Sequence, residues 1–171
     1  MSASKQTAFD YIDEKSGVIT DVSDKIWDYA ELSLREYKSG ELYAKVLKEE
    51  GFTVEHPFDN IETAFRASYG SGKPVIGILA EYDALAGVGH ACGHNLLGTA
   101  VAAAACALKA DMEATDATGT IRVYGCPAEE IMSGKIVMND QGVFNDLDVA
   151  ITWHPFDRNR VSNDILSLIH I

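Results

Sequence analysis

Two histidines, a cysteine and two carboxylates lie in one glycine-spaced segment, EYDALAGVGHACGH, at residues 81–94. In its HACGH end, Cys92 and His94 are two residues apart, so their side chains can project to the same side of an extended chain. Thiolate and imidazole are good ligands for a borderline divalent cation, and added carboxylates extend the preference toward manganese. The segment predicts a metal-binding loop. The alternative is a structural cysteine beside a surface histidine.

Two further clusters carry ionisable side chains. Glu129 and Glu130 follow a strand and a proline in CPAEE, where one acid can bind metal while its neighbour serves as a base. His154, in TWHPF, also ends an apolar strand and could complete the ligand set. Asp83 could orient a histidine ring through a hydrogen bond. The alternatives are a solvated acidic turn, a core histidine and a strand-end cap.

Two other chemistries fit parts of the pattern. A nucleophilic Cys92 with His90 or His94 as its base would make a thiol hydrolase, but such a site has no use for the paired glutamates and His154. The stretch GSGK, residues 70–73, lacks the spacing of a phosphate-binding loop and the hydroxyl residue that should follow its lysine. A metal site therefore accounts for more of these residues than either alternative.

The elements that position the clusters follow from the apolar pattern. A helical period predicts helices over residues 9–29 and 39–51, and again over 95–109 and 134–144. Short apolar runs predict strands in FTVE, TAFRASY, PVIGILAEY, TIRVYG and DVAITW. This alternation predicts an α/β fold, a three-layer sandwich with a mixed, mostly parallel sheet. Each cluster follows a strand, and sites in such folds gather at strand ends.

Composition narrows the class of protein. The chain has 171 residues, 47% of them hydrophobic, which suits one domain or part of one. Its net charge of −12 argues against a nucleic-acid partner, and its longest uncharged stretch is too short to span a membrane. The start, MSASKQTAFD, has no secretory pattern, and three cysteines are too few for a disulfide framework. We expect a cytoplasmic protein with reduced thiols.

Taken together, AEYDALAGVGHACGHNLLGTA, YGCPAEE and WHP resemble the metal-dependent amidohydrolases related to aminoacylase and carboxypeptidases. The motifs match, in order and spacing over about residues 75–156, the branch that contains hippurate hydrolase and the auxin-conjugate hydrolases. The resemblance implies a zinc-peptidase-like catalytic domain with two divalent ions, zinc or manganese. It also implies a small-molecule substrate, an N-acyl or aminobenzoyl amino acid, and a full-length protein that forms a homo- or hetero-dimer.

The resemblance also implies roles for individual residues. The family's metal ligands match four positions: Cys92, His94, Glu130 and His154. Glu129 matches the catalytic base, which deprotonates the bound water and then supplies the proton of the leaving amine. Asp83 and His90 match flanking positions, and we expect them only to support the ligands.

Length separates this chain from that family. Its members run more than twice as long, with an inserted dimerisation domain and a last ligand histidine near the C-terminus. We therefore expect residues 1–165 to be the N-terminal part of the catalytic domain, and an inactive metal-binding fragment or regulatory subunit is the alternative function. The final LSLIHI, residues 166–171, is what a common transposon-end sequencing adapter encodes in frame. We interpret it as non-native; the alternative is an ordinary C-terminal strand.

Overall fold

The computed structural model describes residues 3–157, in which helices and strands alternate along most of the chain. The elements are α1 (Ala3–Tyr29), α2 (Tyr37–Glu49), β1 (Thr53–Glu55), β2 (Phe65–Ser71), β3 (Val75–Ala80), α3 (His94–Thr115), β4 (Gly119–Gly125), α4 (Glu129–Met132), α5 (Gly134–Asp140) and β5 (Val149–Ile151). Each helix and strand expected from the apolar pattern is present, and α3 extends further than expected. The short helix α4 was not expected. The interpretation of residues 166–171 as non-native lies outside the described residues.

The strands form one mixed sheet in the order β1-β2-β4-β3-β5. β3 pairs in parallel with β4 and β5, whereas β2 runs antiparallel to both β4 and β1. The expected α/β fold with a mixed sheet is confirmed, with the parallel ladders confined to β4, β3 and β5. The carboxyl ends of these three strands lie at one edge of the sheet, so the segments that follow them meet there.

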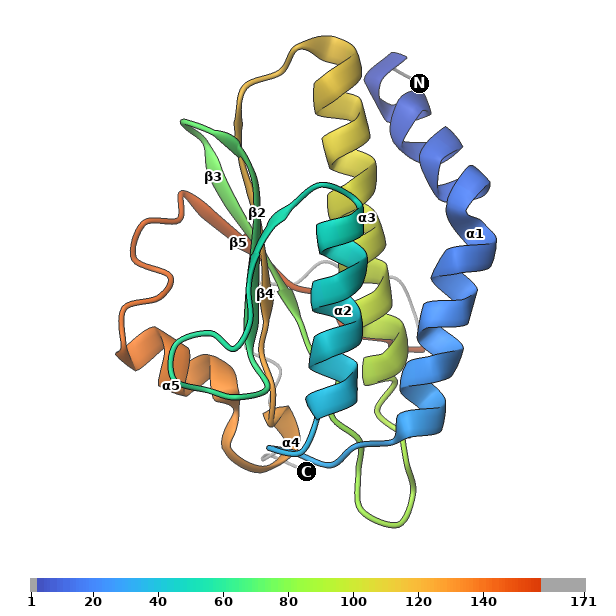
Figure 1. Cartoon of the computed structure of the whole chain (residues 1–171), viewed down its shortest axis with the longest axis vertical. Helices are drawn as coiled ribbons and strands as arrows, with labels where there is room; N and C mark the ends of the chain where they lie inside the picture. The colour runs from blue at the N-terminus through green and yellow to red at the C-terminus, as the bar shows by residue number, and fades with distance from the viewer. Residues whose placement is uncertain (1–2, 158–171) are drawn as a thin grey trace.

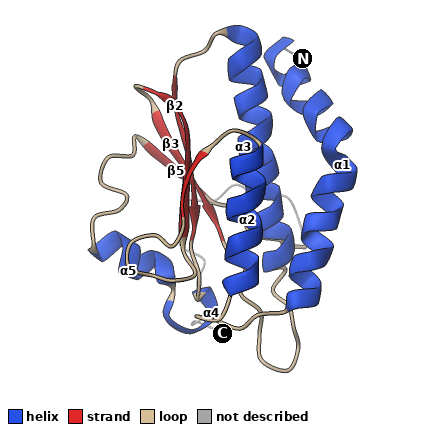
Figure 2. Cartoon of the chain, viewed as in Figure 1, coloured by secondary structure: helices blue, strands red, loops and turns tan. Residues whose placement is uncertain are grey.

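Helices cover the two faces of the sheet unequally. α2 and α3 pack on one face and α1 lies outside α3, while α4 and α5 lie on the opposite side (Figure 1, Figure 2). The larger core fills the space under α2 and α3, and fully buried side chains such as Leu47, Phe65, Leu97 and Val123 form it. A smaller cluster around Tyr124 and Met138 packs beneath α5. Burial of apolar surface on both faces fixes the sheet that carries the strand-end segments.

A glycine in α3 lets the helix approach β3 closely, and we expect Gly98→Ala to destabilise the chain by about 1–3 kcal/mol. A Cβ at position 98 would lie 2.6 Å from the carbonyl oxygen of Glu81 and 2.8 Å from the hydroxyl of Tyr43. Urea unfolding of the variant measures the loss. The control is Gly17→Ala on exposed α1, where no atom lies within 4 Å, and it should gain up to about 1 kcal/mol. Equal stabilities for both variants would contradict this packing.

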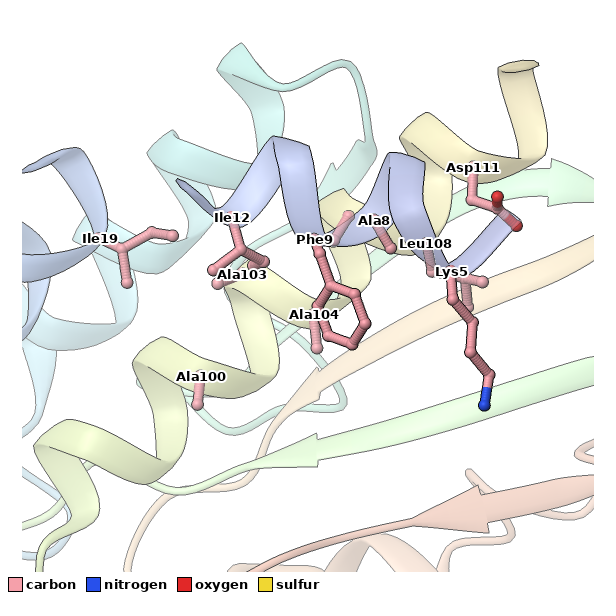
Figure 3. A pocket seen from close by; sticks show the side chains of 11 residues that line it. Lys5, Ala8, Phe9, Ile12, Ile19, Ala100, Ala103, Ala104, Leu108 and Asp111 are labelled. Carbon is pink, nitrogen blue, oxygen red and sulfur yellow. The ribbon is translucent and has the colours of Figure 1, made fainter. Parts of the chain in front are cut away.

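The outer surface of this helical layer carries an apolar groove between α1 and α3. The groove has a volume of about 450 Å³, and Phe9, Ile12, Ala100 and Ala104 are among the residues that line it (Figure 3). Phe9 remains half exposed at its rim. None of the helices in residues 3–157 has the length and apolar character needed to cross a membrane.

Candidate metal centre

The loop that joins β3 to α3 makes a tight turn just before the helix begins. Gly93 has a φ of +79°, in the left-handed region that glycine adopts without strain. A Cβ there would lie 3.0 Å from Cγ of Pro155, in the segment that follows β5. Glycine therefore allows the Cys92–His94 turn to lie against the segment that carries His154.

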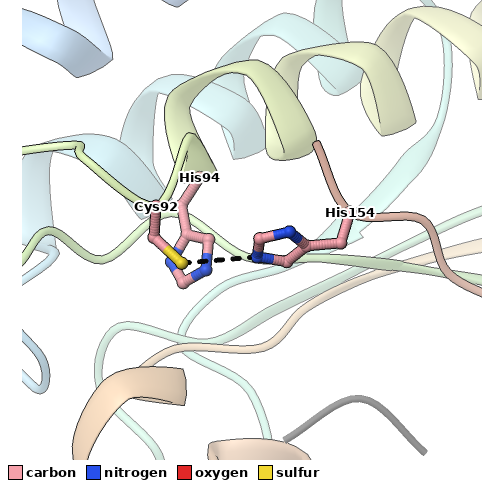
Figure 4. Close-up of side chains that lie close together, drawn as sticks. All are labelled: Cys92, His94 and His154. Carbon is pink, nitrogen blue, oxygen red and sulfur yellow. Dashed lines mark hydrogen bonds between the residues drawn. The ribbon is translucent and has the colours of Figure 1, made fainter. Parts of the chain in front are cut away.

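Cys92, His94 and His154 converge at this turn (Figure 4). Their potential ligand atoms all lie within 4.8 Å of one another. Sγ of Cys92 is 3.4 Å from Nε2 of His154, and the two histidine rings meet edge to face with centroids 5.6 Å apart. His94 is fully buried, while the other two side chains are half-buried. One cation could contact all three donors.

The orientation of His94 is fixed by Asp83. Nδ1 of His94 lies 3.0 Å from both Oδ1 and the carbonyl oxygen of Asp83, and since both are acceptors, Nδ1 must carry the proton. Asp83 is fully buried and also accepts hydrogen bonds from Ser33 Oγ at 2.6 Å and from the backbone N–H of Glu130 at 3.0 Å. Burial raises the pKa of Asp83, but the hydrogen bonds from His94, Ser33 and Glu130 outweigh it and lower the pKa overall. The Asp83 carboxylate thus directs Nε2 of His94 into the cluster.

Three glutamates surround the free side of the His94 ring. Oε2 of Glu81 lies 3.2 Å and Oε1 of Glu130 lies 3.8 Å from Nε2 of His94. Glu129 also has a carboxylate oxygen within 4.8 Å of ligand atoms of Glu81 and His94. Lys135, from α5, forms an ion pair with Glu81. Burial, together with the charge of Glu81, raises the pKa of Glu129.

Several donor atoms of this cluster are buried and unsatisfied. Nε2 of His94 and Oε1 of Glu130 have no hydrogen-bond partner among residues 3–157, although such buried polar atoms are normally paired. Burial and the adjacent Glu130 raise the pKa of the Cys92 thiol to about 12, so the carboxylates oppose its ionisation. A divalent cation would accept the free lone pairs and favour the thiolate. Sulfur, imidazole and carboxylate donors together fit a borderline metal such as zinc.

The structure places one expected residue differently from the rest. Nε2 of His90 lies 3.0 Å from the carbonyl oxygen of Ile26 in α1, and its ring centroid is 6.3 Å from that of Trp27. In this position His90 contacts α1 and not a side chain of the cluster. Burial lowers its pKa, as suits a neutral ring that donates to a carbonyl.

Two residues of the cluster escaped the sequence-based interpretation. Glu81 follows β3 and precedes Asp83 by two positions, so alternation along an extended segment could have indicated that both carboxylates face one side. Lys135 gave no such signal, because an isolated lysine in a predicted helix is usually solvated. Its side chain is three-quarters buried here and reaches Glu81 across the loop.

Known proteins share this sequence and fold, although no protein-family model matches the chain. The chain is 50% identical, over 153 residues, to a subunit of p-aminobenzoyl-glutamate hydrolase from Escherichia coli K12, the protein to which the three motifs pointed. That match covers 80% of this chain and 32% of the relative. The chain is also 35% identical to Xaa-Arg dipeptidase of Mus musculus, over 91% of this chain and 39% of the relative.

A solved structure shares the fold. The dinuclear metal-binding M20 peptidase YXEP of Bacillus subtilis superposes with a TM-score of 0.68 at 24% identity, over 78% of this chain and 41% of that one. The chain thus spans about a third of the length of the two curated relatives. Over the part of these proteins that it spans, the chain belongs to the M20 family of metallopeptidases and amidohydrolases.

Proposed function

We propose that this chain is the metal-binding part of a hydrolase that cleaves the amide bond between an N-acyl or aminobenzoyl group and an amino acid. One observation carries the proposal: Cys92, His94 and His154 converge on one point, where Nε2 of His94 is buried without a hydrogen-bond partner among the described residues. Cys92, His94, Glu130 and His154 would hold the metal. Two divalent ions, zinc or manganese, fit the number of donors around His94, with Glu81 as a further candidate ligand.

The chemistry then divides between metal and protein. A bound divalent ion supplies a Lewis acid that lowers the pKa of water and polarises a carbonyl group. Glu129 takes a proton from the attacking water as its oxygen bonds to the amide carbon. Glu129 then gives that proton to the amine nitrogen as the carbon–nitrogen bond breaks. A carboxylate with a raised pKa suits both transfers, and burial with the nearby Glu81 raises that of Glu129.

The identity of the acyl group is inferred from the relatives. The Escherichia coli relative is named for the hydrolysis of p-aminobenzoyl-glutamate, and its identity of 50% to this chain favours an aminobenzoyl-glutamate-like substrate. That relative is also named as a subunit, which supports a dimeric full-length protein. Since the chain spans about a third of it, we propose that residues 1–165 are the N-terminal part of a catalytic domain. The alternative is an inactive metal-binding fragment.

Metal content measured by elemental analysis of the purified, dialysed chain tests the proposal directly. We expect at least one zinc or manganese ion per chain, and Cys92→Ser should lose most of it because a thiolate ligand is removed. Cys106→Ser is the matched control: this buried cysteine lies in α3 among core residues and should retain the metal. A wild-type chain without metal would refute the proposal, and equal metal in both variants would remove Cys92 from the ligand set.

Hydrolysis of an aminobenzoyl-glutamate substrate by the same samples separates the enzyme from the alternatives. Turnover that chelation abolishes and manganese restores fits the metal-dependent hydrolase and excludes a thiol hydrolase. Bound metal without turnover favours the inactive fragment.

A further inference from the structure

A second buried glutamate lies close to the metal centre without belonging to it. Glu36 precedes α2 and its side chain is fully buried, although glutamate is almost never fully buried without a partner. The side chain does not cap α2, since it makes no hydrogen bond to the first turn of that helix. Its position therefore needs an explanation other than helix capping.

The carboxylate of Glu36 instead holds a backbone group that is distant in the sequence. Oε1 of Glu36 accepts a hydrogen bond of 2.7 Å from the N–H of Ala128. Ala128 is buried and has a φ of 59°, a left-handed conformation that alanine seldom adopts. Such a backbone persists only where its surroundings enforce it. The hydrogen bond from Ala128 to Glu36 is one of those enforcing contacts.

The conformation of Ala128 decides where the paired glutamates point. Ala128 is the residue immediately before α4, whose first two residues are Glu129 and Glu130. The N–H of Glu130 donates to Oδ2 of Asp83 at 3.0 Å. Two buried carboxylates, those of Glu36 and Asp83, thus hold the backbone on either side of Glu129. Loss of the first would let this turn relax and move both acids away from His94.

We infer that Glu36 is a positioning residue for the metal centre, whose carboxyl oxygen holds Ala128 so that Glu129 and Glu130 face His94. The inference rests on the proposed function, because it assigns Glu36 an effect on metal binding. It concerns the reach of the side chain to Ala128. A glutamine of the same length keeps the accepting oxygen, whereas aspartate keeps the charge and lacks the reach.

Cobalt titration of the metal-free chain, followed by the thiolate-to-cobalt absorption band, tests the inference in three variants. Glu36→Ala and Glu36→Asp should each bind cobalt about 10–100-fold more weakly than the wild type, as is usual when a supporting partner of a metal site is lost. Glu36→Gln should restore affinity to within about threefold, since the hydrogen bond to Ala128 is kept. Thermal unfolding of each variant is recorded in parallel.

Glu31→Ala is the matched control for general loss of stability. Glu31 accepts hydrogen bonds from the backbone N–H groups of Lys38 and Ser39 in the first turn of α2. Its loss should lower the unfolding temperature and leave cobalt affinity unchanged. Equal weakening by Glu31→Ala, or wild-type affinity in Glu36→Ala and Glu36→Asp, would overturn the inference alone. A wild-type chain that binds no cobalt would overturn the proposed function and the inference with it.

Discussion

Glu130→Gln is expected to weaken zinc or manganese binding by more than about 100-fold, while Glu129→Gln keeps the metal. Oε1 of Glu130 is buried, lacks a hydrogen-bond partner among residues 3–157 and lies 3.8 Å from Nε2 of His94. A glutamine there offers a poorer ligand and no negative charge. The contrast is informative because Glu129 also has an oxygen near Glu81 and His94. Titration of the dialysed chain with either metal measures both affinities.

The same two variants should differ in catalysis. Glu129→Gln should lower kcat on an aminobenzoyl-glutamate substrate by about 10²–10⁴-fold with metal bound, because an amide cannot accept the proton of water. Glu113→Gln is the control, since Glu113 lies in an exposed ion pair with Lys109 on α3 and should change neither quantity. Equal metal loss and equal loss of activity in Glu129→Gln and Glu130→Gln would contradict the assigned division of labour.

The secondary structure could be predicted because it follows from local pattern. The nearly continuous apolar run that contains β3 predicted a buried strand, and the alanine-rich run that contains α3 predicted a helix. The order of the strands could not be predicted, because pairing depends on contacts distant in sequence. The reversed direction of β2, which makes half of the ladders antiparallel, belongs to this class. Helix α4 has four residues, too few to show a periodicity.

The candidate site divides in the same way. Cys92, His94 and His154 each follow a predicted strand, and because parallel strands end at one edge, the sequence already grouped them. No local pattern links Glu36 to Ala128, which are 92 residues apart and meet only in the folded chain. The pairing of Glu81 with Lys135 spans 54 residues and had the same obstacle. Residues that support a site are thus harder to find than its proposed ligands, whose side chains recur in short motifs.

Removal of the Asp83 carboxylate is expected to destabilise the metal-free chain by about 3–5 kcal/mol, as when one partner of a buried ion pair is lost. Its side chain is fully buried and accepts hydrogen bonds from His94, Ser33 and the N–H of Glu130. Asp83→Ala would leave those three donors without their acceptor. Burial lowers the pKa of His94, but Asp83 and the neighbouring glutamates outweigh it and raise the pKa, so part of the loss is electrostatic. Urea unfolding in the presence of a chelator measures the change.

Ser33→Ala separates the network from a single hydrogen bond. Ser33 donates to Oδ2 of Asp83 at 2.6 Å, and its removal leaves the other two donors paired, so we expect a loss of about 1 kcal/mol. A loss below about 1 kcal/mol for Asp83→Ala, or one equal to that of Ser33→Ala, would contradict the network. The larger expected cost arises because Asp83 links α3, through His94, to the start of α4, through Glu130. The carboxylate that orients the proposed histidine ligand therefore also stabilises the turn that carries the paired glutamates.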